Sequence, residues 1–405
     1  MERGLASRGL AVRSTLSCNG RVELRRRRFE QPDGTTDAAA VDDLIDLAGR
    51  GVSLAAREMC CRVAVDAGSF ARAASNLSRL AGLTLSDEKL RQVAESEGRA
   101  VLAWQDDDDG QLELDFDAGR WVTDATPDGG GRPVARAYVG IDGFLLPVVT
   151  DAEAGRRFEA ARRRRRTLKR RRGVRRPRLR RRRGADQRYK ELKLVTAYDQ
   201  DKAHRLVRAT RGGADRAGRM LRQVRDDVRL HRADQVVAVT DGAEWIARLV
   251  ERDLPRERTT VILDYYHASQ HVHQARRAVF GESAPEGRAW ADGVLGPLLN
   301  GRFEDLWRVL VRTRSKLRSP AKREALDDLM RYLGQRRAKV DYPEFRAAGL
   351  DIGSGPTESM CKSLSRRMKG VGMRWTAANA ESLVALEALH QSDLWSSYWS
   401  SRLVA

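Results

Sequence analysis

Apolar residues follow a helical period in the first clearly patterned part of the chain. Between residues 70 and 80 they recur every three or four positions, directly after Ser69, whose side chain is a good helix cap. Gly82 interrupts this pattern, and a second helical period that includes Leu90 and Val93 begins after Ser86. The sequence therefore predicts two helices joined by a short turn that contains glycine.

This pair of helices has the pattern of a helix-turn-helix, in which the second helix can enter the major groove of DNA. In that interpretation Arg91 and Gln92 are candidates for contacts with bases or phosphates. An ordinary helical hairpin fits the same pattern equally well. Residues 1–50, which precede the unit, are weakly patterned, so we expect a weakly ordered segment there.

Beyond residue 131 the pattern changes to short runs that are typical of β-strands. Two of these runs flank Asp142-Gly143, a dipeptide that favours a hairpin turn. Later runs are rich in valine and isoleucine and alternate with helical periods, and from His267 to Arg337 the chain reads as helical. We therefore predict an α/β sheet with a large helical insertion. The predicted strands are 137–141, 144–149, 190–198, 235–240 and 259–263, and the predicted helices between them are 214–230 and 243–251.

Three aspartates stand where predicted strands stop: Asp142, Asp241 and Asp264. A carboxylate at the carboxyl end of a strand is held rigidly and can face a crevice, which is where open α/β sheets bind ligands. Asp-Gly is also ordinary turn chemistry, so a single instance would carry little weight. Three instances in one predicted sheet indicate a candidate site.

A fourth acid, Glu358, lies on a predicted helix that follows a glycine-rich loop and has Pro356 near its first position. Helical spacing places basic residues on the face of Glu358 and apolar residues on another face. A carboxylate followed by cations suits a phosphodiester strand, although a surface helix with an ordinary i,i+4 ion pair is the alternative. The basic track is Lys362, Arg366 and Lys369, and the apolar face is Cys361, Leu364, Met368 and Val371.

Positive charge is concentrated in one stretch of the chain. The net charge is +20, from 76 Lys and Arg against 56 Asp and Glu, and 16 of the 22 residues from 162 to 183 are Arg or Lys. Such a run repels itself, so we expect a disordered loop there. Arginine binds phosphate groups bidentately, which favours a nucleic-acid partner over a solvated spacer.

The composition also argues against a membrane protein, a secreted protein and a disulfide-rich protein. No stretch approaches 18 consecutive apolar residues, so we expect no membrane span. The first 30 residues lack the apolar core of a secretory signal. Four cysteines in 405 residues do not make a disulfide framework, and a cytoplasmic location is therefore expected.

Together these segments resemble the DDE transposases of bacterial insertion sequences, in particular the ISKra group, whose relatives include the Mutator-like transposases. The resemblance extends from about the helix-turn-helix to the C-terminus and rests on an ordered set of motifs, of which the last two are long and specific. The motifs are YVGIDG (138–143), ADQRYKELKLVTAYDQD (185–201), VTDGAEWI (239–246), LDYYHASQHV (263–272), GSGPTESMCKSLSRRMKGVGMRW (353–375) and NAESLVALEALHQSDLWSSYW (379–399).

The resemblance implies an RNase H-like core in which Asp142, Asp241 and Glu358 are the catalytic residues and the ligands of Mg²⁺, with Mn²⁺ as a substitute. Asp264 and His267 match an Asp-x-x-His element and are expected to support the active site. The implied activity is metal-dependent cleavage of DNA at transposon ends, followed by strand transfer into target DNA. The implied partners are terminal inverted repeats and target DNA, bound by a homo-oligomer that is associated with the nucleoid.

The patterns and the resemblance together divide the chain and give the candidate DNA contacts. The expected parts are a weakly ordered segment (1–50), an all-α helix-turn-helix region (51–104), the first part of the core (132–281) with the loop 162–183, a helical insertion (282–345) and the last part of the core (346–405). The candidate DNA contacts are Arg91, Gln92, Arg162, Arg163, Arg164, Arg170, Arg171, Arg172, Arg181, Arg182, Lys362, Arg366, Lys369 and Arg374.

Near the N-terminus, Cys18 and the residues 21–30 are similar to the remains of a zinc-ribbon-like segment of relatives. Other residues stand where further cysteines are expected, and Cys60 and Cys61 are adjacent, so we predict no structural zinc. For Trp375 we favour a place in the core over a stacking platform for an unpaired base. Two alternatives to an active transposase stay open: an inactive or repurposed DNA-binding protein, and an RNase H-like nuclease or resolvase without strand transfer.

Overall fold

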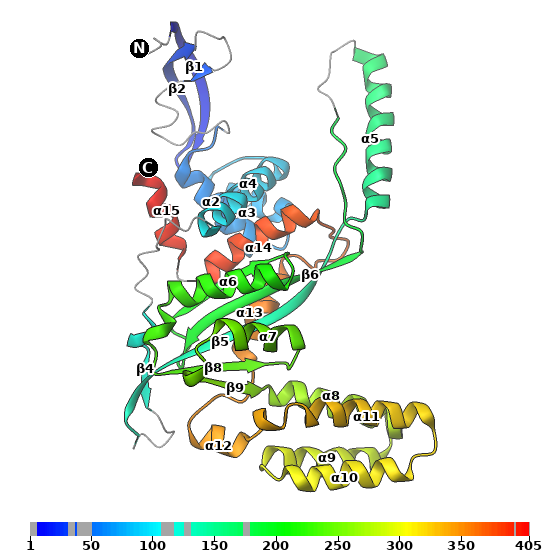
Figure 1. Cartoon of the computed structure of the whole chain (residues 1–405). Coiled ribbons are helices and arrows are strands. Elements are labelled where there is room, and N and C mark those ends of the chain that lie inside the picture. The colour runs from blue at the N-terminus through cyan, green and yellow to red at the C-terminus, as the bar shows by residue number, and fades with distance from the viewer. Residues whose placement is uncertain are drawn as a thin grey trace.

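A computed structural model of the chain shows a mixed α/β fold, as predicted (Figure 1). A mixed sheet lies at its centre, helices cover both faces of the sheet, and a group of helices extends from one end. No helix of the described residues is long and apolar enough to cross a membrane. The described residues are 6–30, 37–38, 51–106, 117–124, 131–172, 179–392 and 394–404.

The central sheet has the strand order β7-β6-β5-β8-β9, and β4 pairs with β5 outside this path. The strands β5, β6 and β7 are antiparallel, whereas β8 is parallel to β5, and β9 is parallel to β8. Two of the predicted strands, β8 and β9, are confirmed to the residue. The bounds are β4 (Val122–Asp124), β5 (Pro133–Pro147), β6 (Tyr189–Asp199), β7 (Arg205–Thr210), β8 (Gln235–Thr240) and β9 (Thr259–Leu263).

The predicted hairpin turn at Asp142-Gly143 is wrong, because β5 passes through this dipeptide without interruption. Asp142 pairs with Leu194 and Gly143 pairs with Lys193 in the ladder between β5 and β6. A Cβ atom at Gly143 would lie 2.5 Å from the Oε1 atom of Glu191 on β6. This glycine therefore leaves room for the Glu191 side chain of the neighbouring strand instead of forming a turn.

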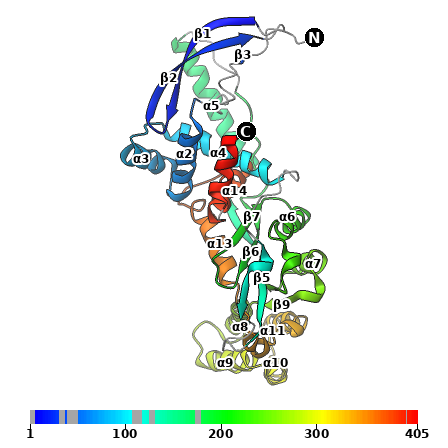
Figure 2. The ribbon, with the colours of Figure 1, turned by 90° about the vertical axis from the view of Figure 1, so that its left-hand side faces the viewer.

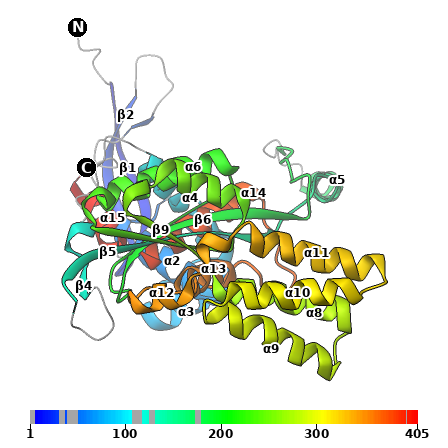
Figure 3. The same ribbon diagram turned by 60° about the horizontal axis from the view of Figure 1, so that its bottom comes forward.

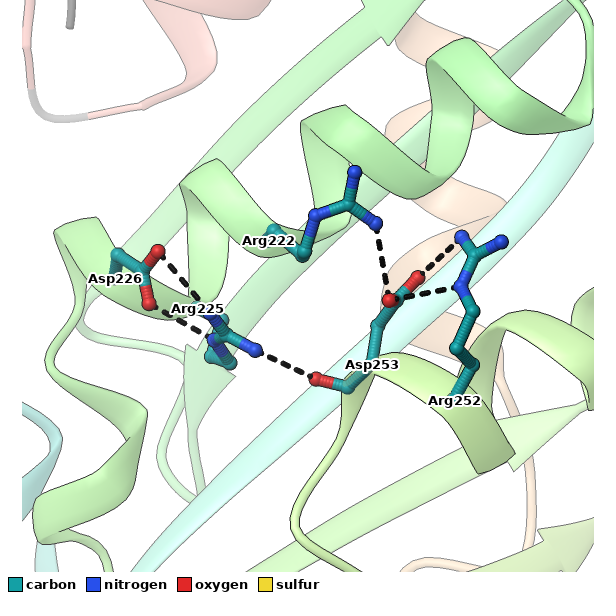
Figure 4. Close-up of polar contacts among 5 residues, drawn as sticks. All are labelled: Arg222, Arg225, Asp226, Arg252 and Asp253. Atoms are coloured by element: carbon teal, nitrogen blue, oxygen red, sulfur yellow. Dashed lines mark hydrogen bonds and ion pairs between the residues drawn. The ribbon is translucent and has the colours of Figure 1, made fainter.

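Helices α6 (Ala214–Asp227) and α7 (Glu244–Asp253) cover one face of the sheet, and α13 (Gly355–Arg366) lies on the other (Figure 2). Asp253 joins α6 to α7: its carboxylate accepts hydrogen bonds from Arg222 at 3.0 Å and from Arg252 at 2.9 and 2.7 Å (Figure 4). Burial alone would raise the pKa of Asp253, but these charged hydrogen bonds outweigh burial and lower it.

The helical insertion lies between β9 and α13 (Figure 3). Its first helix begins directly after β9, where Asp264 caps the first turn by accepting a hydrogen bond of 2.9 Å from the backbone N–H of His267. The predicted helical stretch from His267 to Arg337 is thereby confirmed. The helices are α8 (Tyr265–Phe280), α9 (Pro285–Leu299), α10 (Phe303–Lys316), α11 (Pro320–Gly334) and α12 (Tyr342–Ala347).

The two predicted N-terminal helices exist, but they do not form a unit of their own. Gly82 ends the first helix in a left-handed conformation with a φ of 66°. The second helix packs so closely on α14 that a Cβ atom at Gly98 would lie 2.0 Å from the carbonyl oxygen of Ser382. Residues 51–104 therefore share a core with the C-terminal helices. The elements are α2 (Leu54–Asp66), α3 (Phe70–Ala81), α4 (Asp87–Asp106), α14 (Ala377–Gln391) and α15 (Trp395–Val404).

Residues 6–30 form a β-hairpin, so the expectation of a weakly ordered segment is wrong for this part of 1–50. Strands β1 (Ala6–Ser17) and β2 (Gly20–Glu30) are antiparallel, and β3 (Asp37–Ala38) pairs with β2. Gly20 closes the turn with a positive φ of 102°, which favours glycine. The arginines of β2 lie opposite residues of β1 in the ladder. Because arginine occupies positions of both kinds along β2, the alternation of polar and apolar residues that indicates a strand is not visible in the sequence.

The expected disordered loop at 162–183 is wrong up to residue 172, where the long helix α5 (Asp151–Arg172) ends. Arginine is a good helix former, and the acidic residues Asp151 and Glu153 in the first turn complement the helix dipole. Arg157 adds an ion pair of 2.7 Å with Glu153. Helix α5 projects from the end of the sheet (Figure 1). Residues 173–178 lie outside the described residues, and 179–183 are irregular.

Candidate active site

Two of the predicted catalytic residues lie at equivalent positions of neighbouring parallel strands. The ladder between β5 and β8 ends at the pair Val139 and Ala238, and Asp142 and Asp241 each follow three residues later. Each carboxylate is oriented by a backbone N–H, since Gly143 donates to Asp142 at 2.6 Å and Ala243 donates to Asp241 at 2.7 Å. Both side chains are half-buried, so they are held by the fold and still reach solvent.

Helix α13 brings the third predicted residue, Glu358, to the same strand. Thr357 lies directly over Gly140 of β5, where a Cβ atom would be 2.0 Å from the Thr357 Oγ1 atom. One turn further along α13, the thiol of Cys361 donates a hydrogen bond to the carboxylate of Asp142. The glycine of the YVGIDG motif therefore allows the helix of Glu358 to approach the strand of Asp142.

The three carboxylates are close enough to influence one another electrostatically. Burial raises the pKa of Asp142, and the negative charges of Asp241 and Glu358 raise it further. The hydrogen bonds from Cys361 and Gly143 oppose this effect without cancelling it. Three acids separated by about a hundred residues in the sequence thus form one cluster of negative charge.

Asp264 is a structural support for this cluster. It is buried, with 1% of its surface exposed, and its second carboxylate oxygen accepts hydrogen bonds from the backbone N–H of Ser354 at 2.7 Å and from the Ser354 hydroxyl. Asp264 therefore joins the start of α8 to Ser354, the residue that precedes α13. His267 is half-buried, and its ring contacts that of His271 at a centroid distance of 5.1 Å.

The loop before α13 is fixed from the sheet as well. The buried guanidinium of Arg136 on β5 donates hydrogen bonds of 3.0 and 3.1 Å to the carbonyl oxygens of Ala348 and Gly349. The hydroxyl of Tyr138 accepts one of 3.1 Å from the N–H of Asp351. Alternate residues of β5 therefore fix the loop that leads to Glu358.

The residue types of the cluster fit a hard divalent cation, because Mg²⁺ prefers carboxylate oxygens. Within the part of the chain that the structure describes, however, no group of three or more His, Cys, Asp or Glu side chains is arranged to hold a metal ion. Asp142, Asp241 and Glu358 therefore match Mg²⁺ in chemistry, but the described residues do not form a ready set of metal ligands.

The predicted basic track is present on α13 and beyond its end. Lys362, Arg366 and Lys369 are exposed, and Lys362 makes the ordinary ion pair with Glu358 at 3.5 Å. The helix ends earlier than expected, at Arg366, so Lys369 follows it in a loop. Cys361, Leu364 and Met368 are buried as predicted, whereas Val371 is fully exposed.

The residues after α13 tie it to the rest of the molecule. Arg374 lies 3.8 Å from Glu153 in the first turn of α5. Trp375 is buried, with its ring N–H bonded to the Met368 carbonyl oxygen at 3.0 Å, which confirms its place in the core. The contact of Arg374 therefore places the start of α5 next to the segment that follows the Glu358 helix.

Arg91 and Gln92 are not presented as the helix-turn-helix interpretation requires. The guanidinium of Arg91 contacts Glu88 and Glu95, both at 2.6 Å, and Gln92 donates to Glu88 at 2.8 Å. The opposite side of α4 is buried, so this helix is a packing element of the core. Arg91 and Gln92 nevertheless line a groove of 650 Å³ together with Arg182.

The arginine-rich segment itself is largely solvent-exposed where its side chains are described. Arg162, Arg163 and Arg164 on α5 are exposed, and so are Arg181 and Arg182. Arg170, Arg171 and Arg172 belong to the last turn of α5, and their side chains lie outside the described set.

The raised pKa of Asp142 leads to a stability prediction. Because the fold disfavours its charged form, ionised Asp142 destabilises the protein above its raised pKa, and this effect vanishes below the ordinary aspartate pKa. We therefore expect Asp142→Asn to raise the melting temperature at pH 7.5, with a difference that shrinks as the pH falls toward 4. Thermal unfolding monitored by circular dichroism at several pH values measures it.

Asp253 is the matched control, since its pKa is shifted in the opposite direction. Asp253→Asn should lower the melting temperature at pH 7.5, and this loss should also shrink as the pH falls. If Asp142→Asn destabilised the protein as Asp253→Asn does, the charge cluster around Asp142 would be refuted.

Sequence reasoning missed four side chains at this site. Cys361 carries no signal other than its place on the apolar face, and His271, Tyr332 and Arg336 come from the helical insertion. The Tyr332 hydroxyl donates to the carbonyl oxygen of Asp241 at 2.8 Å, a contact that only the folded chain creates.

No family model matches the chain, and no curated protein compared with it is significantly similar.

Proposed function

We propose that this protein is a DNA transposase of the DDE type, with Asp142, Asp241 and Glu358 as the residues that hold Mg²⁺ and catalyse phosphodiester cleavage and strand transfer. The observation that carries the proposal is the meeting of three acids, one inside β5, one directly after β8 and one on α13, close enough for two of them to raise the pKa of the third. A path of three antiparallel strands followed by two parallel ones is compatible with an RNase H-like core and supports it.

The proposed chemistry follows from the residue types. A divalent cation at such carboxylates activates an oxygen nucleophile and stabilises the leaving oxygen of an in-line displacement at phosphorus. Gly143 and Ala243 orient two of the carboxylates through their N–H groups, and Cys361 orients the first one further. Lys362, Arg366 and Lys369 extend from Glu358 as cations that suit a continuing DNA strand.

A second candidate is a DNA-binding protein without catalytic activity. It is favoured by the finding that no group of acidic, His or Cys side chains among the described residues is arranged to hold a metal ion. A nuclease or resolvase without strand transfer would use the same residues.

One experiment separates all three: incubation of the purified chain with Mg²⁺ or Mn²⁺ and a duplex that carries the inverted repeats flanking its gene. Nicked and joined products indicate a transposase, nicked product alone a nuclease, and a shifted but uncut duplex a DNA-binding protein.

The exposed arginines of α5 provide a separate prediction about DNA binding. We expect the triple substitution Arg163→Gln, Arg164→Gln and Arg166→Gln to weaken binding to any duplex and to reduce its dependence on salt. Each lost phosphate contact lowers the slope of log K against log salt by about 0.9, so the expected reduction is about 2 to 3. Fluorescence anisotropy of a labelled duplex between 50 and 300 mM NaCl measures the slope.

The control removes the same charge from the helical insertion, through Arg312→Gln, Arg318→Gln and Lys322→Gln. These side chains are also exposed, on α10, on α11 and in the connection between them, far from α5 (Figure 1). The control should retain the slope of the wild-type protein. Equal losses in both triple variants would mean that net charge alone governs binding and that α5 makes no direct contact.

A further inference from the structure

The turn that follows β8 and carries Asp241 is fixed by side chains from a distant helix. The hydroxyl of Tyr332 on α11 donates to the carbonyl oxygen of Asp241 at 2.8 Å. Arg336, just beyond the end of α11, donates to the next carbonyl oxygen, that of Gly242, from Nε at 3.0 Å and also from Nη2. Two consecutive carbonyl groups of the turn are therefore bound by the insertion, about 90 residues away in the sequence.

The backbone of this turn is shaped to receive these groups. Gly242 has a φ of 84°, in the left-handed region that favours glycine. A Cβ atom at Gly242 would lie 2.4 Å from Nε and 2.8 Å from Cδ of Arg336, so the glycine also leaves the space that Arg336 fills. The same turn supplies the N–H of Ala243, which holds the Asp241 carboxylate at 2.7 Å.

The two donors are themselves held in place. The guanidinium of Arg336 lies over the ring of Tyr332, 4.3 Å from its centroid, and donates to the Tyr332 carbonyl oxygen at 2.9 Å. The ring of His271 from α8 also stacks on Tyr332, at a centroid distance of 4.0 Å. These residues line one side of a cavity of 470 Å³ between α8 and α11. Tyr332 and Arg336 are therefore held by the specific contacts above more than by tight packing between the two helices.

We propose that Tyr332 and Arg336 are positioning residues, through which the helical insertion sets the orientation of the Asp241 carboxylate. The proposal rests on the function proposed above, in which Asp241 holds the metal ion. Fixing the two carbonyl groups fixes the N–H of Ala243, and this N–H fixes the carboxylate. Partners of this kind, which orient a ligand without touching the ion, typically change metal affinity or activity about 10- to 100-fold when they are removed.

The test uses two mild substitutions in the full-length protein. Tyr332→Phe keeps the ring stack and loses only the hydroxyl, and Arg336→Lys keeps the charge and loses the forked pair of donors. We expect faster hydrogen exchange in peptides that cover residues 239–246, with Mn²⁺ binding weakened about 10- to 100-fold in the absence of DNA. In the cleavage assay kcat should fall by a similar factor, with the KM for DNA unchanged.

Arg331→Gln provides the matched control, because Arg331 lies on the same helix and pairs with the exposed Asp328 at 2.8 Å. It should leave exchange at 239–246, Mn²⁺ binding and kcat as in the wild type. Unchanged exchange in both test variants would overturn the proposal, and so would faster exchange with unaltered Mn²⁺ affinity. The exchange measurement needs no catalytic activity. A wild-type protein that fails to cut DNA would therefore refute the proposed function, and hydrogen exchange and Mn²⁺ binding would still decide whether Tyr332 and Arg336 position Asp241.

Discussion

Replacement of any one of the three carboxylates, by Asp142→Asn, Asp241→Asn or Glu358→Gln, is expected to abolish Mg²⁺-dependent nicking of a duplex that carries the inverted repeats. Each variant removes one charged oxygen ligand, and the stabilisation that a metal ion gives to displacement at phosphorus amounts to several kcal/mol. A loss of about 4 kcal/mol corresponds to a rate about 10³-fold lower. The appearance of nicked strands from an end-labelled duplex over time measures it.

DNA binding should survive these substitutions, because they leave the exposed basic residues of α5 and of the track on α13 in place. A gel-shift titration of each variant tests this separately from cleavage. Asp292→Asn, which removes an exposed carboxylate from α9 in the insertion, is the control and should cut at the wild-type rate. Undiminished nicking by all three active-site variants would refute the assignment of Asp142, Asp241 and Glu358 as catalytic residues.

The parallel part of the sheet could be predicted because its strands bury both faces. The segments QVVAVT and TTVIL are nearly continuous apolar runs, and β8 and β9 coincide with them. Strand β7, RLVRAT, could not be recognised, because Arg208 in its centre is charged and still buried. Its guanidinium is neutralised by Asp227 on α6 and donates to the carbonyl oxygen of Gln105, partners that only the fold provides.

The arginine-rich helix α5 shows a different limit of sequence reasoning. Charge repulsion within the run predicts disorder, whereas the high helix propensity of arginine predicts the opposite. The acidic first turn favours a helix, since Glu153 pairs with Arg157 and also lies near Arg374, in the segment that follows the Glu358 helix. In α5 the helix propensity of arginine therefore outweighs the repulsion between its positive charges.

At the candidate site, the acids could be found because each follows a short apolar run or a glycine-rich loop in the sequence, although Asp142 lies inside β5 and does not end it. What surrounds them could not, because the contacts join segments far apart in the chain. Tyr332 reaches the turn of Asp241 from a helix about 90 residues away, and the helical spacing of Cys361 predicts only a packing face, whereas its thiol also interacts with Asp142. The sequence predicts which groups can do chemistry, and packing decides which groups orient them.

The close contact between Gly140 and Thr357 leads to the second large expected effect. Gly140→Ala would place a Cβ atom 2.0 Å from Thr357 Oγ1 and 2.8 Å from Thr196 Cγ2, so α13 must move away from β5. We expect a loss of about 1–3 kcal/mol in the free energy of unfolding, as for other overpacked cores. Since Glu358 moves with α13, cleavage should fall on the order of 10²-fold, as for a misplacement of about 1 Å. Urea unfolding and the nicking assay measure the two effects.

Two further variants separate displacement of α13 from a general loss of packing. Thr357→Ala removes the two atoms of Thr357 that the new Cβ would meet, so the double variant Gly140→Ala/Thr357→Ala should regain most of the lost activity. Gly218→Ala, on α6 at the opposite face of the sheet, is the control, because it also adds a Cβ atom to a packed contact, 3.1 Å from Cδ2 of Leu249, and does not touch α13. If Gly140→Ala cut DNA as fast as the wild type, or if Gly218→Ala impaired cutting equally, the contact between β5 and α13 would not set the distance between Asp142 and Glu358.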